Sequence, residues 1–373
     1  MTPTGPGPAT DPVRATGAVP TAGPGRAPDT DRTTGTGPAT GTSRTTHTVP
    51  ATGTRPGPAT GTPAAPAGAA PPVLDPGLLA RRATADPLFR LAAYALEAAH
   101  GVRPGGVWSA PYAFHLGSPG LVAAAGWPVA AAAAPRTDGL VRLSSLSHPA
   151  HSCDLPLTLS GPPPDTPGWA VRPYAVLRAL ARAGYGRGGC DLHVQGSLTE
   201  AAGLATAEPA ECALALAVTG VHAEVPPPRE ELARLLARAL PDGDDALRRA
   251  VLFARPGQAL LLRGSTATAG GQPPRHVAFD PAASGSRLVL VAVRGEPAAV
   301  PDDVARAMTC ARRAGALSAW PPGDRPGRSV LVLLPRDRSA AVRTAVVEDF
   351  RARDRPVPRF LNIAVAGAAR REA

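Results

Sequence analysis

Apolar residues are distributed very unevenly along this chain. Up to residue 72 the sequence consists largely of Thr, Pro, Gly and Ala, without a single aromatic residue, Leu or Ile. A segment with so little apolar surface cannot offset its conformational entropy by burial. Residues 1–72 are therefore predicted to be a disordered leader, either tolerated without a role or used as a tether or phosphorylated segment. Folded sequence is expected from Val73 onward.

From Val73 onward, apolar positions recur with the 3.6-residue period of helices or gather in short β-rich runs. Helices are expected at 75–100 (where Pro87 can break the helix), 174–183, 208–218, 230–240, 244–253, 302–315 and 338–353. Strands are expected at 107–110, 140–143, 155–157, 190–194, 259–262, 288–293 and 330–334. Helices and strands are interspersed in two halves, which predicts an α+β protein with domains at 73–225 and 226–373.

The charge balance narrows the function classes. The 373 residues carry 39 basic and 29 acidic side chains, and every basic side chain is an arginine because the chain contains no lysine. This excludes a Schiff-base lysine, a P-loop lysine and the ATP-anchoring lysine of protein kinases. The arginines are scattered, without a basic stripe interleaved with aromatic residues, so a nucleic-acid partner is not expected.

The cysteines and the hydropathy indicate the compartment. The four cysteines, Cys153, Cys190, Cys212 and Cys310, form no C-x-x-C pair, so neither a zinc site nor a disulfide framework is expected. No apolar run approaches the length of a membrane span, and no signal-peptide core is found near the N-terminus. The expectation is a cytoplasmic protein without a membrane partner, acting as a monomer.

Four short segments stand in an order that is typical of one enzyme family. Residues 100–111 read H-G-V-R-P-G-G-V-W-S-A-P, 198–211 read L-T-E-A-A-G-L-A-T-A-E-P-A-E, 257–262 read G-Q-A-L-L-L, and 367–370 read G-A-A-R. In this order they resemble the galactokinases, and the resemblance extends over residues 76–373.

The resemblance implies the two-domain fold of the small-molecule kinase superfamily that contains galacto-, homoserine, mevalonate and phosphomevalonate kinases. That fold has a ribosomal-S5-domain-2-like N-terminal α/β domain with a phosphate loop and a ferredoxin-like C-terminal domain. The resemblance also implies that ATP, Mg²⁺ and a sugar or related small molecule bind between the two domains.

The phosphate loop matches the family pattern in part. Gly203 and Leu204 agree with it, while A-T-A at 205–207 replaces three serines. The resemblance therefore places ATP at Gly203, Leu204 and Thr206, where free amides and the helix dipole favour an anion. Thr206 is the hydroxyl that remains for phosphate or Mg²⁺. Glu208, at the helix start, is expected to disfavour a triphosphate nearby by about 1 kcal/mol or more.

The first galactokinase motif has lost its chemical groups. Ala113 stands where galactokinases have the arginine that polarises the sugar hydroxyl and the phosphate. Ser118, Pro119 and Leu121 replace the sugar-binding Glu, His and Asp, a large loss for sugar discrimination. His115 remains, and it is expected to be structural.

The position of the catalytic base in galactokinases is altered as well, so no residue of this chain is assigned a catalytic role. Counting back from Gly257 places Leu247 at the family aspartate, with Asp244 and Asp245 as substitutes after a local shift. The glycine-rich loop of the family reads G-D-R-P-G-R at 323–328. The resemblance thus implies a galactokinase-like ATP:sugar 1-phosphotransferase with impaired catalysis. The alternative is a non-catalytic ligand-binding or regulatory pseudokinase on the same fold.

Overall fold

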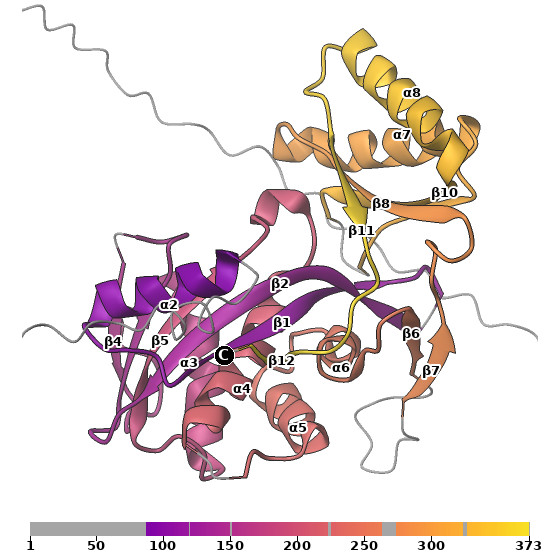
Figure 1. Cartoon of the computed structure of the whole chain (residues 1–373). Helices are drawn as coiled ribbons and strands as arrows, with labels where there is room; N and C mark the ends of the chain where they lie inside the picture. Colours follow the sequence, from indigo (N-terminus) through magenta and orange to yellow (C-terminus); the bar gives the residue numbers. More distant parts are fainter. Residues whose placement is uncertain are drawn as a thin grey trace, which may run out of the picture. The chain divides into compact units, whose positions relative to one another are not determined.

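The α+β class is confirmed by the computed structural model, in which two sheets carry helices (Figure 1). The structure describes residues 87–372 except 119, 150, 223–224, 263–273 and 324–326. These residues belong to one compact unit that spans Pro71–Ala373. The expected leader, 1–72, and the first part of the helix expected at 75–100 lie outside the described residues.

The first sheet contains eight strands within the described part of the chain. Its main path runs β12-β1-β2-β5-β3-β4, with β6 paired to β2 and β7 paired to β6. β3 and β5 are parallel, and the other neighbours are antiparallel. The strands are β1 (Gly106–His115), β2 (Leu121–Pro135), β3 (Leu140–Ser144), β4 (Cys153–Pro156), β5 (Gly189–Gly196), β6 (Gln258–Leu261), β7 (Arg275–Ala278) and β12 (Arg370–Arg371).

Helices cover both faces of this sheet. α2 (Pro87–His100) packs on one face, and α4 (Ala207–His222) and α6 (Asp245–Phe253) pack against β1 and β2 from the other (Figure 1). α3 (Gly168–Arg182) contacts α4, and α5 (Arg229–Ala239) contacts α3 and α6. Alternate alanines of β2 therefore face opposite helices, so the strand is buried on both sides.

The second sheet has the ferredoxin-like arrangement that the resemblance implies. Its strands run β11-β8-β10-β9, all antiparallel, and α7 and α8 follow β8 and β10 in the chain. Their apolar side chains form a separate core with this sheet. The elements are β8 (Ser286–Ala292), α7 (Val300–Arg313), β9 (Ser318–Trp320), β10 (Ser329–Pro335), α8 (Ser339–Ala352) and β11 (Arg359–Ile363).

The boundary expected at residue 225 does not separate the two sheets. α5, α6, β6 and β7 follow that residue, yet they pack on or pair within the first sheet. After β11 the chain returns to the first sheet, where Val365 bridges Ala125 and β12 pairs with β1. The prolines at 226–228 only connect α4 to α5, so the ferredoxin-like part extends from Ser286 to Ile363.

The helix predicted at 174–183 begins earlier in the structure. α3 begins at Gly168, six residues before the predicted start at Tyr174, with Pro173 inside its first turns. No helix in the described part of the chain is long and apolar enough to cross a membrane.

Close packing of α4 on the sheet depends on a glycine beneath an aromatic ring. Trp108 of β1 is 5% exposed, and a Cβ added at Gly220 of α4 would overlap its indole. Interiors packed at this density do not admit an extra methyl without shifts of backbone or side chain.

We therefore expect Gly220→Ala to lower the free energy of unfolding by about 1–3 kcal/mol, measured by urea denaturation. The matched control is Gly168→Ala, also in a helix, where an added Cβ meets nothing within 4 Å. The control should be neutral or slightly stabilising, because alanine favours helix. Equal effects of the two substitutions would contradict this packing account.

A buried histidine links two parallel strands at the far side of this sheet. His193 of β5 is 2% exposed, and its Nδ1 lies 2.9 Å from the Ser144 hydroxyl of β3. Ser144 Oγ also lies 3.0 Å from His100 Nε2. Burial, together with the nearby His100, lowers the pKa of His193 to about 4.

Because an unfolded histidine titrates near pH 6.5, the unfolded chain binds the extra proton first. We expect the stability contributed by neutral His193 to be complete above about pH 6.5 and to be lost as the pH falls toward 4. His193→Gln should shrink the loss of unfolding free energy between pH 7 and 4.5. His151→Gln, at an exposed position, is the control and should leave that loss unchanged.

Candidate functional site

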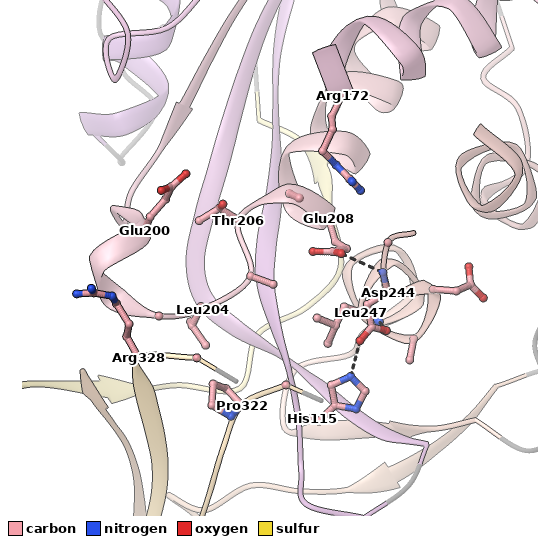
Figure 2. A pocket seen from close by; sticks show the side chains of 18 of the residues that line it. His115, Arg172, Glu200, Leu204, Thr206, Glu208, Asp244, Leu247, Pro322 and Arg328 are labelled. Atoms are coloured by element: carbon pink, nitrogen blue, oxygen red, sulfur yellow. Dashed lines mark hydrogen bonds and ion pairs between the residues drawn. The ribbon is translucent and has the colours of Figure 1, made fainter. Parts of the chain in front are cut away.

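A pocket of about 820 Å³ brings together three of the segments singled out in the sequence. The described residues of its walls are His115 at the end of β1, Gly120, Arg172, Glu200, 203–208, 243–247, Pro322, Gly323, Gly327 and Arg328 (Figure 2). These segments are far apart in the chain. The order of the strands brings them together in the folded unit.

The phosphate loop forms one wall and is fixed by its glycine. Gly203 has a positive φ of 76°, and its carbonyl accepts a 2.8 Å hydrogen bond from Ser329 Oγ. A Cβ at Gly203 would lie 2.7 Å from that oxygen, so no larger residue fits without a shift. Leu204 is 5% exposed and anchors the loop in the core. Thr206 lines the pocket immediately before α4.

The two positions where galactokinases carry charged groups are apolar and packed here. Leu247 is 3% exposed and gives the pocket an apolar surface. Ala113 is 2% exposed within the core of the first sheet and is not among the pocket's lining residues. Neither position offers a group that could bind a substrate hydroxyl.

Of the two aspartates expected as substitutes, Asp244 is fully engaged. Its Oδ1 caps α6 by accepting a 3.1 Å bond from the Leu247 amide, and its Oδ2 lies 2.7 Å from His115 Nε2. Burial raises the pKa of Asp244, but the hydrogen bonds from His115 and the amides outweigh it and leave this pKa below its ordinary value. A carboxylate stabilised in this way is a weak proton acceptor near neutral pH.

The pairing of His115 with Asp244 was not predicted from the sequence, which indicated a structural histidine. His115 ends β1 two residues after Ala113, and its side chain lines the pocket instead of the core. Alternation along a strand places both residues on one face. That alternation was the sequence signal that could have placed His115 beside the lost arginine position.

Glu208 is in the pocket wall, but its carboxylate already has a partner. The residue is 6% exposed, and its Oε1 accepts a 3.0 Å hydrogen bond from the Asp244 amide. Glu208 was expected to be a free carboxylate close to a bound triphosphate. Instead, one of its oxygens is hydrogen-bonded at the N-terminus of α6. Glu208 thus helps to hold Asp244 in place.

Asp245 also lines the pocket, next to Asp244. Its Oδ2 accepts a 3.1 Å bond from Arg249 Nε, and Arg249 also pairs with Glu230 of α5. Its Oδ1 is buried without a hydrogen-bond partner among the described residues. Asp245 is therefore held by an ion pair on the surface of α6.

A buried ion network fixes the helices behind the pocket. Glu211 of α4 is 2% exposed and lies between two arginines: Arg248 Nε at 2.8 Å from Oε2 and Arg172 Nη2 at 2.6 Å from Oε1. Arg248 also donates to the Leu240 carbonyl at 2.8 Å, and a Cβ at Gly243 would overlap its guanidinium. The network joins α3, α4 and α6 directly behind the pocket.

Removing one partner of a buried ion pair typically costs about 3–5 kcal/mol, because the remaining charge stays in a dry site. Since Arg172 still compensates Glu211, we expect Arg248→Met to cost about 2–4 kcal/mol of unfolding free energy, measured by urea denaturation. Arg238→Ala, on the exposed side of α5, removes the same charge and should change stability by less than about 0.5 kcal/mol. A small effect of Arg248→Met would show that the network is dispensable.

The described residues include no group of three or more His, Cys, Asp or Glu side chains that could hold a metal ion. Asp244, Asp245 and Glu208 are instead hydrogen-bonded to His115, Arg249 and backbone amides. Any divalent ion here would depend on ligand phosphates for most of its coordination, as Mg²⁺ commonly does.

Comparisons with solved structures identify the class of fold. A galactokinase of Lactococcus lactis, crystallised with galactose, superposes with a TM-score of 0.62 at 14% identity, covering 74% of this chain and 98% of that one. Mevalonate kinase of Methanococcus jannaschii (TM-score 0.50, 11% identity, 70% and 98% coverage) is similar to a lesser degree. The chain therefore has the fold of these small-molecule kinases.

Within that class the sequence comparison is with galactokinase. A galactokinase of Streptomyces coelicolor is 32% identical over 211 residues, which are 52% of this chain and 52% of that protein. The match thus spans about half the length of the curated relative. No protein-family model matches the chain. The predicted resemblance to galactokinases is confirmed.

Proposed function

We propose that the protein is a galactokinase-like, ATP-binding phosphotransferase in which phosphorylation of galactose is weak or absent. The observation that carries the proposal is a contrast between two parts of the protein. The expected phosphate loop keeps a positive-φ glycine, Gly203, whereas the positions to which the resemblance assigns the chemistry, Ala113 and Leu247, are packed and apolar.

The phosphate side of the pocket supports a nucleotide. A positive-φ glycine lies in the loop that leads to α4, and the absence of a Cβ there lets Ser329 approach and hold that loop. The first amides of a helix have no partner within the helix, and with the helix dipole they favour an anion. Gly203, Leu204 and Thr206 are the residues we assign to ATP, and bound Mg²⁺ would supply charge neutralisation on the phosphates.

The side of the pocket where a phosphate acceptor would bind supports the proposal that catalysis is impaired. Asp244 is the carboxylate nearest to the role of base, but both of its oxygens are hydrogen-bonded and its pKa is lowered. Loss of one charge-stabilising group typically costs about 10²- to 10³-fold in rate, and such losses need not add. The same observations support a second candidate, a non-catalytic ligand-binding or regulatory protein that retains the nucleotide site.

Two measurements on the full chain test the proposal. Calorimetry should show ATP binding that strengthens with Mg²⁺, and a coupled assay with galactose and MgATP should show turnover near background. Turnover at ordinary kinase rates, about 1–100 per second, would contradict impairment. ATP hydrolysis or phosphorylation of another small acceptor would exclude the non-catalytic candidate.

A pair of glycine variants assigns the ATP site. Gly203→Ala should abolish ATP binding, because the added Cβ would press on Ser329 and displace the phosphate loop. Gly101→Ala is the matched control, since Gly101 also has a positive φ but its Cβ would meet nothing within 4 Å. Restoring the galactokinase residues, Ala113→Arg with Leu247→Asp, is a poor test here because both charges would enter packed sites.

A further inference from the structure

We infer that Arg328 is the cation that binds the phosphate chain of the ligand in this lysine-free protein. The inference rests on the proposed function, since it takes the ligand to be a nucleoside triphosphate. It assigns a binding role to a residue in the segment before β10. The resemblance implies a glycine-rich loop in this segment in galactokinases.

The backbone of Arg328 is fixed directly against the phosphate loop. Its carbonyl accepts a 2.7 Å hydrogen bond from the Val293 amide, and the hydroxyl of the next residue, Ser329, donates to the Gly203 carbonyl. A Cβ on Gly203 would lie 3.1 Å from the carbonyl carbon of Arg328. The backbone from which the Arg328 side chain extends is therefore packed against the loop to which we assign the phosphates.

The guanidinium of Arg328 is held only weakly by the protein. Its Nη2 makes one long contact, 3.4 Å from the exposed Gly295 carbonyl, and none of the ion pairs within 4.0 Å among the described residues includes it. Figure 2 shows Arg328 on the side of the pocket where Glu200 and Leu204 also lie. Glu200 is exposed there, so water screens its attraction for the guanidinium.

Among the described residues of the pocket, the second arginine is already paired with carboxylates of the protein. Arg172 lines the pocket, but it donates to Glu211 at 2.6 Å and to Asp242 at 2.6 Å. Turning Arg172 toward a ligand would leave the buried Glu211 with one partner fewer, which is costly. Arg328 can turn to a ligand at the loss of one weak bond.

Arginine is suited to this task for a chemical reason. Its planar guanidinium presents paired N–H donors that match two phosphate oxygens, and it remains charged at every physiological pH. Hydrogen bonds of this charge-assisted kind correspond to about 10- to 100-fold in affinity.

The test is calorimetry on the full chain with three probes: MgATP, sodium pyrophosphate and adenosine. We expect Arg328→Ala to weaken binding of MgATP and pyrophosphate by about 10- to 100-fold and to leave adenosine binding unchanged. Arg328→Lys should recover part of the loss, because it restores the charge without the paired donors. Arg294→Ala is the control: it removes one charge from an exposed position of the adjacent loop that does not line the pocket.

Each outcome decides the inference. If Arg328→Ala binds MgATP and pyrophosphate as Arg294→Ala does, Arg328 does not hold the phosphates, and the proposed nucleotide site stands without it. If all probes weaken together, the substitution has deformed the pocket, and the role in phosphate binding is wrong. If the unmodified chain binds neither MgATP nor pyrophosphate, the proposed function fails first and the inference fails with it.

Discussion

The pocket depends on one buried carboxylate. Glu211 lies within α4 and is shared by Arg248 and Arg172, which belong to α6 and α3. A buried charge of this kind is tolerated only when its hydrogen-bonding capacity is met. The three helices must therefore keep the spacing that satisfies Glu211. The loop at Gly243 can approach Arg248 because it carries no Cβ.

This constraint also fixes the wall of the pocket at the N-terminus of α6, where the polar groups are already paired with one another. With α6 fixed, Asp244 lies at its N-terminus, where one oxygen caps the helix and the other binds His115. Glu208 then closes the arrangement by accepting from the Asp244 amide. Asp244 and Glu208 thus stabilise the wall of the pocket. A group held so firmly by its own neighbours has little capacity left for a substrate proton.

The sequence predicted the elements whose signals are local. The positive-φ turn at Gly203 precedes a helix as the sequence indicated, and the helices from residue 208 onward agree with the structure in type. The long strand β2 was not predicted, because its run of alanines shows no alternation and alanine favours helix. The contact of His115 with Asp244 joins residues 129 apart, so only the tertiary structure could reveal it.

The ferredoxin-like part contacts both ends of the pocket. Ser329 holds the phosphate loop through the Gly203 carbonyl. At the other end, the Pro322 carbonyl accepts from the His115 amide at 2.7 Å, and the Trp320 indole donates to the His115 carbonyl at 2.9 Å. A shift of this sheet would move the phosphate loop and the His115 wall together. The hydrogen bonds that join the two sheets therefore also hold two walls of the pocket, which makes the position of the second sheet part of the pocket's geometry.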